Sequence, residues 1–326
     1  MGTELPIHRY YLLDGLRGLA AFFVMIGHLS SHSGHIGIFV DFFFVLSGFV
    51  LTPSISRHVK SSRKIFIFAR ISRFYATLII MIIFIIFFER MPLVRDIFDV
   101  PVHSVFTYFG IFFLLQIFYA PFTNLNSPLW SLSAEFWVNI MAIFLVSKVS
   151  TVKLAVSGAI IFIGAHFTNE FFGLGWQPWL YFEALGRSMF GFFLGMILFN
   201  RISRIGTSLR YIKLISILLT FIIIAYFQNE YHLIYLLGAP ISYLLIAEII
   251  KINESKVSTQ LLVFCRYMGK ISFGVYAWHY LIMEMHLVSG VWLEVAFTLL
   301  IADLSQRFLE KPLQRTMSKF FPKIHN

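Results

Sequence analysis

The chain has a single cysteine, few charged residues and no internal repeat. Cys265 alone excludes a disulfide framework and any metal cluster built from several cysteines. Only 13% of the 326 residues are charged, whereas 58% are hydrophobic, and the mean hydropathy is +0.80. A soluble domain of this length carries more charge, so the composition predicts a membrane protein crossed by many helices. The apolar runs are continuous, which argues against the alternating pattern of a β-barrel.

Ten apolar runs are long enough to cross a bilayer, so the sequence predicts an all-α fold, a polytopic transmembrane helical bundle of ten spans. A further apolar segment, 103–119, gives eleven spans if it crosses and leaves ten if it is re-entrant or interfacial. The first run lacks a small-residue cleavage site, which favours a retained signal-anchor. The ten runs are 12–31, 36–54, 66–88, 128–147, 152–168, 180–199, 211–227, 231–250, 268–286 and 288–306.

The basic residues favour ten spans over eleven. With ten, all but six of the 26 Lys and Arg residues fall in cytoplasmic segments, as the positive-inside rule requires when both termini are cytoplasmic. With eleven, the basic loop from Arg201 to Lys213 faces outwards. The net charge of +10 is therefore a topological signal, and no nucleic-acid partner is expected. The six exceptions are Arg90 and Arg95 in outer loops and Arg17, Arg70, Arg73 and Arg187 within helices.

Three ionisable residues, Asp14, Arg17 and His28, lie in the first predicted span. Each ionisable group in hydrocarbon costs about 2.5–3.5 kcal/mol on insertion scales, so such groups usually mark a functional site. Arg17 and His28 are eleven residues apart, which puts them on one helix face and about 16 Å apart along the axis. Asp14 falls on the same side. The shared face favours a polar cavity over the plain alternative, a snorkelling Arg17 and a His28 that bonds a neighbouring helix.

Arg70 and Arg73 begin the third span on one face, at its predicted cytoplasmic end. Two guanidinium groups can hold a phosphate through bidentate hydrogen bonds, whereas the plain alternative is positive-inside anchoring. Glu135 lies one turn from Ser131 and one turn from Asn139, within a Trp-rich span. A buried carboxylate must be protonated or paired, so Glu135 either binds an arginine such as Arg17 or Arg187 or handles protons.

Further polar residues lie in the other spans. Asp41, near the outer end of the second span, can orient His28 across a short loop. A metal site at His28, His32 and His35 is not expected, because two of the three lie around a turn with no cysteine nearby. The ninth span holds His279, Glu284 and His286, and the sixth holds Glu183 and Arg187, four residues apart and predicted to be structural.

Taken together, these segments resemble the acyltransferase-3 family of integral membrane acyltransferases, which acylate bacterial surface polysaccharides, peptidoglycan and some small molecules. LDGLRGLAAFFVMIGH is similar to the family's first helix, with Arg17 and His28 matching its arginine–ten residues–histidine signature. ARISRF matches an arginine-x-x-arginine motif, and PLWSLSAEFW matches the motif that contains Glu135. VDFFFVLSGFVL, GKISFGVYAWHY and FLEKP resemble the second-helix and closing motifs. Phe136 departs from the family, which often has an acidic residue or glutamine there.

The resemblance implies a membrane O-acyltransferase in the bacterial inner membrane, with acyl-CoA as donor, by expectation acetyl-CoA, and no metal. The implied partners are a carbohydrate or lipid-linked glycan acceptor of the cell envelope, such as lipopolysaccharide O-antigen, and membrane lipids. The implied domain organisation is one domain over 1–326 without the fused extracellular esterase-like domain of some members. The runner-up from the residues alone is a transporter or flippase for an anionic or acylated lipid or glycan.

On this interpretation Arg70, Arg73 and Arg17 bind the CoA phosphates at the cytoplasmic end of the bundle. His28, deeper in the membrane, acts on the thioester, either as the general base for the acceptor hydroxyl or as a nucleophile that carries the acyl group. Asp14, Asp41 or Glu135 would orient or stabilise the imidazolium, as a carboxylate does in a catalytic triad. The expected catalytic residues are therefore His28, Asp14, Arg17 and Glu135.

Overall fold

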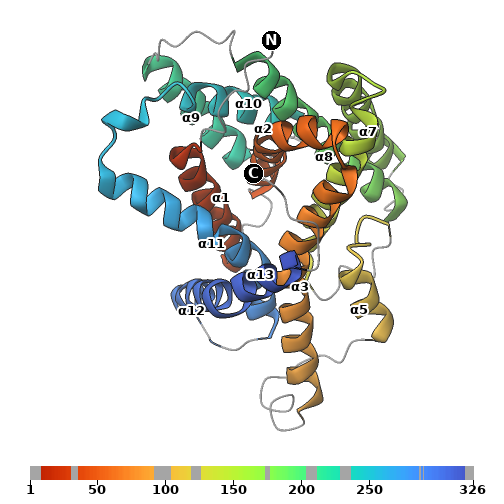
Figure 1. Cartoon of the computed structure of the whole chain (residues 1–326), viewed down its shortest axis with the longest axis vertical. Coiled ribbons are helices and arrows are strands. Elements are labelled where there is room, and N and C mark those ends of the chain that lie inside the picture. Colours follow the sequence, from red (N-terminus) through yellow and green to blue (C-terminus); the bar gives the residue numbers. More distant parts are fainter. Residues whose placement is uncertain are drawn as a thin grey trace.

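The computed structural model describes residues 9–30, 36–91, 104–118, 126–172, 177–202, 211–227, 236–285, 288 and 290–319. Within these ranges the chain is helical and contains no strand (Figure 1). The helices are α1 (Tyr11–Leu29), α2 (Gly37–Lys60), α3 (Arg63–Arg90), α5 (Val105–Phe112), α6 (Leu129–Leu145), α7 (Thr151–Phe172), α8 (Gln177–Arg201), α9 (Tyr211–Phe227), α10 (Gly238–Ile249), the short η5 (Glu254–Lys256), α11 (Thr259–Glu284), α12 (Val291–Leu304), the π-helical η6 (Ser305–Glu310) and α13 (Lys311–Lys319).

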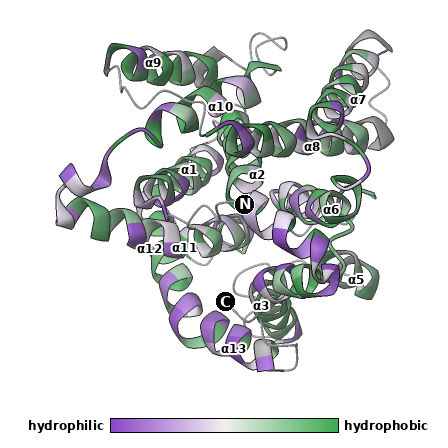
Figure 2. Ribbon diagram, turned by 45° about the horizontal axis from the view of Figure 1, so that its top comes forward, coloured by the Kyte–Doolittle hydropathy of each residue, from purple (hydrophilic) through white to green (hydrophobic). Residues whose placement is uncertain are grey.

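Helices occupy all ten of the apolar runs, and the predicted class, an all-α membrane protein, is confirmed. Five helical segments are long and apolar enough to cross a membrane: α1, α2, α3, residues Thr151–Thr168 of α7 and residues Tyr181–Arg201 of α8. Shorter apolar stretches lie in α6, α9 and α10. Hydrophobic residues cover most of the helices, whereas α13 is largely hydrophilic (Figure 2). Many large apolar side chains are exposed, as lipid-facing positions require.

One helix differs from its predicted span, and another bears on the segment that the sequence left open. The ninth run was predicted to begin at 268, but α11 begins at Thr259, where the hydroxyl of Ser258 caps it by accepting from the Leu261 amide at 3.3 Å. In the 103–119 segment, α5 has only eight residues, a length of about 12 Å. It is followed by Leu114 in a left-handed conformation, with φ of 52°. A helix this short does not cross a hydrocarbon core of about 30 Å.

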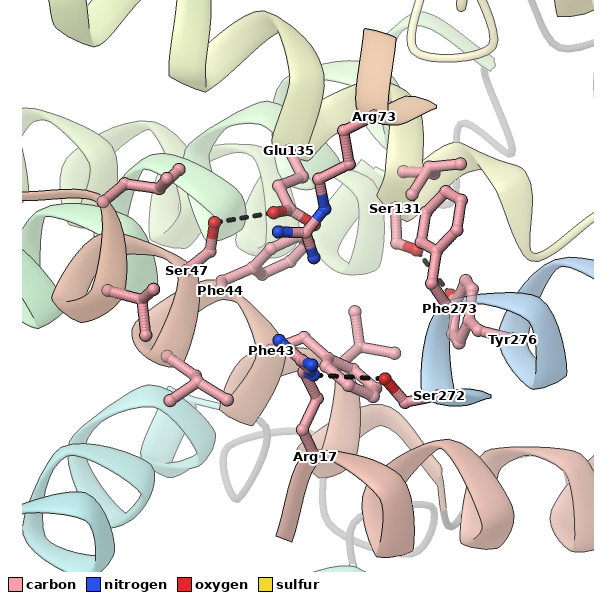
Figure 3. Close-up of a pocket in the computed structure, with 15 residues that line it drawn as sticks. Arg17, Phe43, Phe44, Ser47, Arg73, Ser131, Glu135, Ser272, Phe273 and Tyr276 are labelled. Carbon is pink, nitrogen blue, oxygen red and sulfur yellow. Dashed lines mark hydrogen bonds between the residues drawn. The ribbon is translucent and has the colours of Figure 1, made fainter. Parts of the chain in front are cut away.

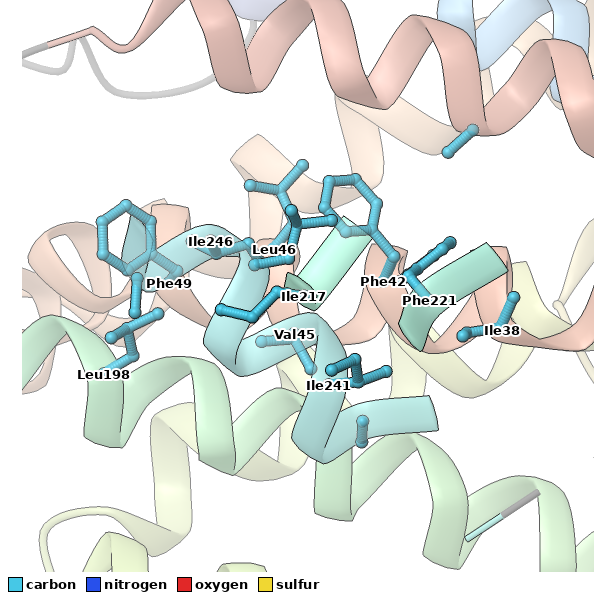
Figure 4. Packing of buried hydrophobic residues seen from close by; sticks show 14 of the residues in the cluster. Ile38, Phe42, Val45, Leu46, Phe49, Leu198, Ile217, Phe221, Ile241 and Ile246 are labelled. Atoms are coloured by element: carbon cyan, nitrogen blue, oxygen red, sulfur yellow. The ribbon is translucent and has the colours of Figure 1, made fainter. Parts of the chain in front are cut away.

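α2 is the central helix of the bundle. Its side chains Ile38, Phe42, Val45, Leu46 and Phe49 form a buried cluster with residues of α8, α9 and α10 (Figure 4). Gly48 lets α2 approach α8 closely, because a Cβ at this position would collide with the backbone of Phe192. Gly48 thus serves the close packing of these two helices.

α1 and α11 form a second close pair and lie side by side (Figure 1). Gly15 faces Cys265 and Gly18 faces Met268, so residue numbers rise together along the two helices and the helices run parallel. A Cβ at Gly269 would lie 2.6 Å from the Cβ of Asp14 and 2.8 Å from its backbone oxygen. Glycine on both helices therefore sets how close they come, and this fixes which side chains of α1 meet which of α11.

Candidate active site

Two cavities meet in the middle of the bundle. The wide cavity, of about 900 Å³, lies between the start of α1, the second half of α2, the end of α8 and the segment after α10. The narrow cavity, of about 70 Å³, continues from it between α1, α2, α6 and α11 (Figure 3). Arg17, Leu46, Val50 and Arg73 line both cavities. The helix ends around the wide cavity are those predicted to be cytoplasmic. A passage from that side narrows between Arg17 and Arg73, and this narrowing is the neck of the site.

Arg17 is held in place by α11 and by Asp14. Its guanidinium donates to the carbonyl oxygen of Gly269 at 2.5 Å and to the hydroxyl of Ser272 at 3.1 Å. The Asp14 carboxylate lies 3.2 Å from Arg17 and also accepts from Arg9 at 2.8 Å. Asp14 and His28 are fourteen residues apart on α1, or about 21 Å. Asp14 therefore orients Arg17, and the expectation that it orients the imidazole of His28 is wrong.

Arg73 is the cation whose donors are open to the cavities. Within the part of the chain that the structure describes, no hydrogen bond or ion pair engages its guanidinium. Its side chain points into the narrow cavity from α3, near Glu135 from α6 and across from Arg17 (Figure 3). Glu135 accepts a hydrogen bond from the hydroxyl of Ser47 at 2.6 Å. The narrow cavity is thus lined by a carboxylate and two guanidinium groups. Among the described residues no ion pair joins Glu135 to Arg17, and Arg187 binds Asp41, so the predicted arginine partner of Glu135 is not found there.

Arg70 occupies a different environment from Arg73. Its guanidinium carbon lies 5.6 Å from the centre of the Phe66 ring. Arg70 lines neither the wide nor the narrow cavity. Its buried Nε has no hydrogen-bond partner among the described residues. The predicted pair of phosphate-binding arginines is therefore divided, with Arg73 at the cavities and Arg70 packed on a ring one turn earlier.

Tyr276 closes the far end of the narrow cavity. Its hydroxyl lies 2.5 Å from that of Ser131 and donates to the carbonyl oxygen of Pro128 at 3.1 Å. Its ring packs edge-on against His279 on the other side, with centroids 5.8 Å apart. Tyr276 thus forms a wall between the narrow cavity and the histidines.

His28 lies behind this wall and is half-buried. Its imidazole stacks on that of His279, with centroids 5.2 Å apart and ring planes 29° apart, and meets the edge of Tyr280 at 5.6 Å. The sequence places His279 in the ninth span without a role. The parallel packing of α1 and α11 brings the two histidines together, although they are about 250 positions apart in the chain. No local sequence pattern predicts such a contact.

Asp41 binds Arg187 and not His28. Its two carboxylate oxygens accept from Arg187 at 2.6 and 3.0 Å, and Arg187 also donates to the carbonyl oxygen of Gly37 at 2.6 Å. Both side chains of this pair are buried. Glu183, predicted to pair with Arg187, lies 3.3 Å from the imidazole of His166. The expectation that Asp41 orients His28 is therefore wrong. Both carboxylate oxygens of Asp41 accept hydrogen bonds from Arg187, and this ion pair links α2 to α8.

The structure offers no support for a metal at this site. His32, His35 and His286 lie outside the described residues. Among the residues that the structure describes, no three His, Cys, Asp or Glu side chains are grouped so that they could hold a metal ion.

Comparison with known proteins assigns the family. A family model described as an acyltransferase domain matches residues 10–300. The chain belongs to the acyltransferase-3 family. The peptidoglycan O-acetyltransferase OatA of Listeria monocytogenes is 26% identical, over 93% of this chain and 55% of its own length. YrhL of Bacillus subtilis, provisionally named a peptidoglycan O-acetyltransferase, is also 26% identical, over 94% of this chain and 55% of its own length.

A third relative matches a shorter part of the chain. Protein 2 in the picA locus of Rhizobium radiobacter is 31% identical over 50% of this chain and 98% of its own length. No solved structure matches the chain. The chain spans about half the length of OatA and YrhL. The acyltransferase-3 family predicted from the motifs is confirmed, and the residues matched by its model include both arginines of the neck and the stacked histidines.

Proposed function

We propose that this chain is a membrane O-acyltransferase that moves an acyl group, acetyl by expectation, from acyl-CoA to a hydroxyl group of a cell-envelope or exported glycan. The observation that supports it best is the line of ionisable side chains on α1, with Arg17 beside Arg73 where the two cavities meet and His28 further along the same helix, behind Tyr276. Family membership supports acyl transfer, and the names of OatA and YrhL favour an acetyl donor and a glycan acceptor. Acetyl-CoA is the proposed donor.

The donor phosphates are assigned to the neck between the cavities. Arg73 has donors that no described residue uses, and a guanidinium binds phosphate through charge-assisted, bidentate hydrogen bonds. Arg17 adds a second positive charge there, reduced by its contact with Asp14. The wide cavity falls within the size range of small-molecule sites and would take the nucleotide portion. Arg70, packed on Phe66, is assigned a supporting role as a nearby cation on the same helix.

His28 is assigned the role of general base in the acyl transfer. It lies about 16 Å beyond Arg17 along α1, a gap that an extended pantetheine arm spans once Tyr276 moves aside. As a general base, the imidazole takes the proton of the acceptor hydroxyl while the oxygen attacks the thioester carbonyl. The C–S bond then breaks, and the leaving thiolate receives the proton from the imidazolium. Glu135 would balance the positive charge of the neck before the donor arrives.

The proposed topology has ten spans with both termini in the cytoplasm, in a bacterial inner membrane. The parallel packing of α1 and α11 supports it, because two parallel transmembrane helices have an odd number of spans between them, and the ten-span order places seven spans between these two. With 103–119 as an additional span, α1 and α11 would run in opposite directions. The helix in this segment, α5, has only eight residues and is too short to be an additional span.

The test uses the purified protein in detergent or nanodiscs, with radiolabelled acetyl-CoA and a panel of peptidoglycan fragments and lipid-linked glycans. Transfer of label to a glycan, abolished in His28→Ala protein that still inserts and accumulates, is the expected result. Near-normal transfer by His28→Ala would overturn the assignment of this residue. Ion-coupled flux of a lipid or glycan without any need for acetyl-CoA would favour a transporter instead.

A further inference from the structure

His28 is held between two rings of α11. The imidazole of His279 lies against its face, and the ring of Tyr280 meets it at an interplanar angle of 82°. His279 itself is fully buried, with 0% of its surface exposed. One face of the half-buried His28 ring is therefore covered by a fully buried ring, that of His279.

The hydrogen bonds of His279 show that this surface is fixed. Its Nδ1 lies 3.1 Å from the carbonyl oxygen of Val275, one turn earlier on α11. A carbonyl oxygen only accepts, so Nδ1 carries a hydrogen and donates it to Val275. Nε2 is buried and has no partner among the described residues. The orientation of the His279 ring is thus set by its own helix.

The helix pair gives the two imidazoles little freedom to slide apart. Gly15, Gly18 and Gly269 are in such close contact with the opposite helix that a Cβ at any of them would collide. Arg17 binds α11 at Gly269 and Ser272, about three turns before the histidines. The relative position of α1 and α11 is therefore fixed at this end of the pair, and buried side chains of the two helices continue the contact as far as Met25 and Val275.

We propose that His279 is a positioning residue for His28, a stacking partner that fixes the orientation of the reactive imidazole. This inference rests on the proposed function for the role of His28 in acyl transfer. A reacting group that is held in one orientation gains rate because less freedom is lost on the way to the transition state. The role needs a flat ring at position 279 and does not need its nitrogen atoms.

The matched variants are His279→Phe, which keeps a flat ring, and His279→Leu, which keeps an apolar side chain without one. We expect His279→Leu to lower kcat about 10- to 100-fold, the scale that small misplacements near a reacting group produce. Its KM for acetyl-CoA stays unchanged, because Arg73 and Arg17 are untouched. His279→Phe keeps kcat within about threefold of wild type. Met283→Leu, on the same helix, controls for general sensitivity of α11.

A second measurement does not depend on acyl transfer. Diethyl pyrocarbonate modifies imidazole nitrogens, and mass spectrometry of peptides gives the rate at His28 alone. We expect faster modification in His279→Leu, where one face of His28 is uncovered, and an unchanged rate in His279→Phe. If the leucine variant fails to accumulate, His279→Met replaces it as the variant without a ring.

The outcomes separate this inference from the proposed function. Equal kcat and equal modification rates in the ring-bearing and ringless variants would overturn the positioning role. If even the wild-type protein transfers no acetyl group, while modification of His28 still differs between the two variants, the proposed function fails and the stacked arrangement stands.

Discussion

Arg17 donates a hydrogen bond of 2.5 Å to the carbonyl oxygen of Gly269, so the cation at the neck of the cavities is also a tie between α1 and α11. The same glycine leaves no space for a side chain, because a Cβ at this position would lie 2.6 Å from the Cβ of Asp14 on α1. The donor end and the histidine end of the site are therefore coupled through one helix pair. Any change that separates α1 from α11 should alter both ends.

Gly269→Ala is expected to destabilise the protein and abolish transfer. The new Cβ would lie 2.6 to 3.0 Å from Asp14 atoms, two of them backbone, so α1 must move away. Overpacking of this kind costs about 1–3 kcal/mol. The measurement is the thermal midpoint in detergent together with acetyl transfer. Gly164→Ala, in α7, is the matched control, because its Cβ would have nothing within 4 Å. A Gly269→Ala protein as stable as this control would contradict the close packing of α1 on α11.

Arg73→Ala is expected to raise the KM for acetyl-CoA about 10- to 100-fold with little change in kcat, since a hydrogen bond to a charged group contributes about 1.5–3 kcal/mol. Arg70→Ala should have a smaller effect, because Arg70 lines neither cavity. Steady-state kinetics over a range of acetyl-CoA concentrations separates the two. A larger effect from Arg70 than from Arg73 would show that the donor phosphates bind elsewhere.

The positions of the helices and the polar stripe of α1 could be predicted from sequence because both depend on residues close together in the chain. Apolar runs locate the helices, and the eleven-residue spacing places Arg17 and His28 on one face, which the structure turns towards α11. Contacts between distant segments could not be predicted in this way. The pairing of Asp41 with Arg187 and of His28 with His279 follows from glycine contacts between helices, which carry no local signal.

The two arginines of the third helix show a finer limit of the sequence. A spacing of three residues gives neighbouring positions on a helix surface, about 60° apart. Two residues at this angle share a face of a helical wheel. In the structure, however, the cavity wall includes Arg73, whereas the side chain of Arg70 packs against Phe66. Where a cavity ends depends on the packing of other helices, so spacing alone assigned both residues the same role.

Asp41→Asn is expected to lower stability strongly, because it removes the negative charge that both carboxylate oxygens of Asp41 present to the buried Arg187. Removal of one partner of a buried pair costs about 3–5 kcal/mol. Replacing both with apolar residues, Asp41→Leu with Arg187→Met, should recover much of the loss. Protein yield and the thermal midpoint in detergent give the comparison. A single Asp41→Asn variant with normal stability and reduced kcat would instead restore the catalytic role for Asp41.

Glu310, just beyond α12, should make stability depend on pH. Burial raises the pKa of its carboxyl group, and the hydrogen bond that it accepts from Ser305 at 2.9 Å offsets this only in part. A raised pKa means that the folded protein holds this proton more tightly than the unfolded chain does. The stabilising contribution of Glu310 is therefore full below the unfolded pKa of about 4.3 and is lost as pH rises through the folded pKa. We expect Glu310→Gln to melt at a higher temperature than wild type at pH 8, with the difference shrinking as pH falls towards 5. Melting curves in detergent at both pH values test this, and a difference that does not change with pH would contradict it.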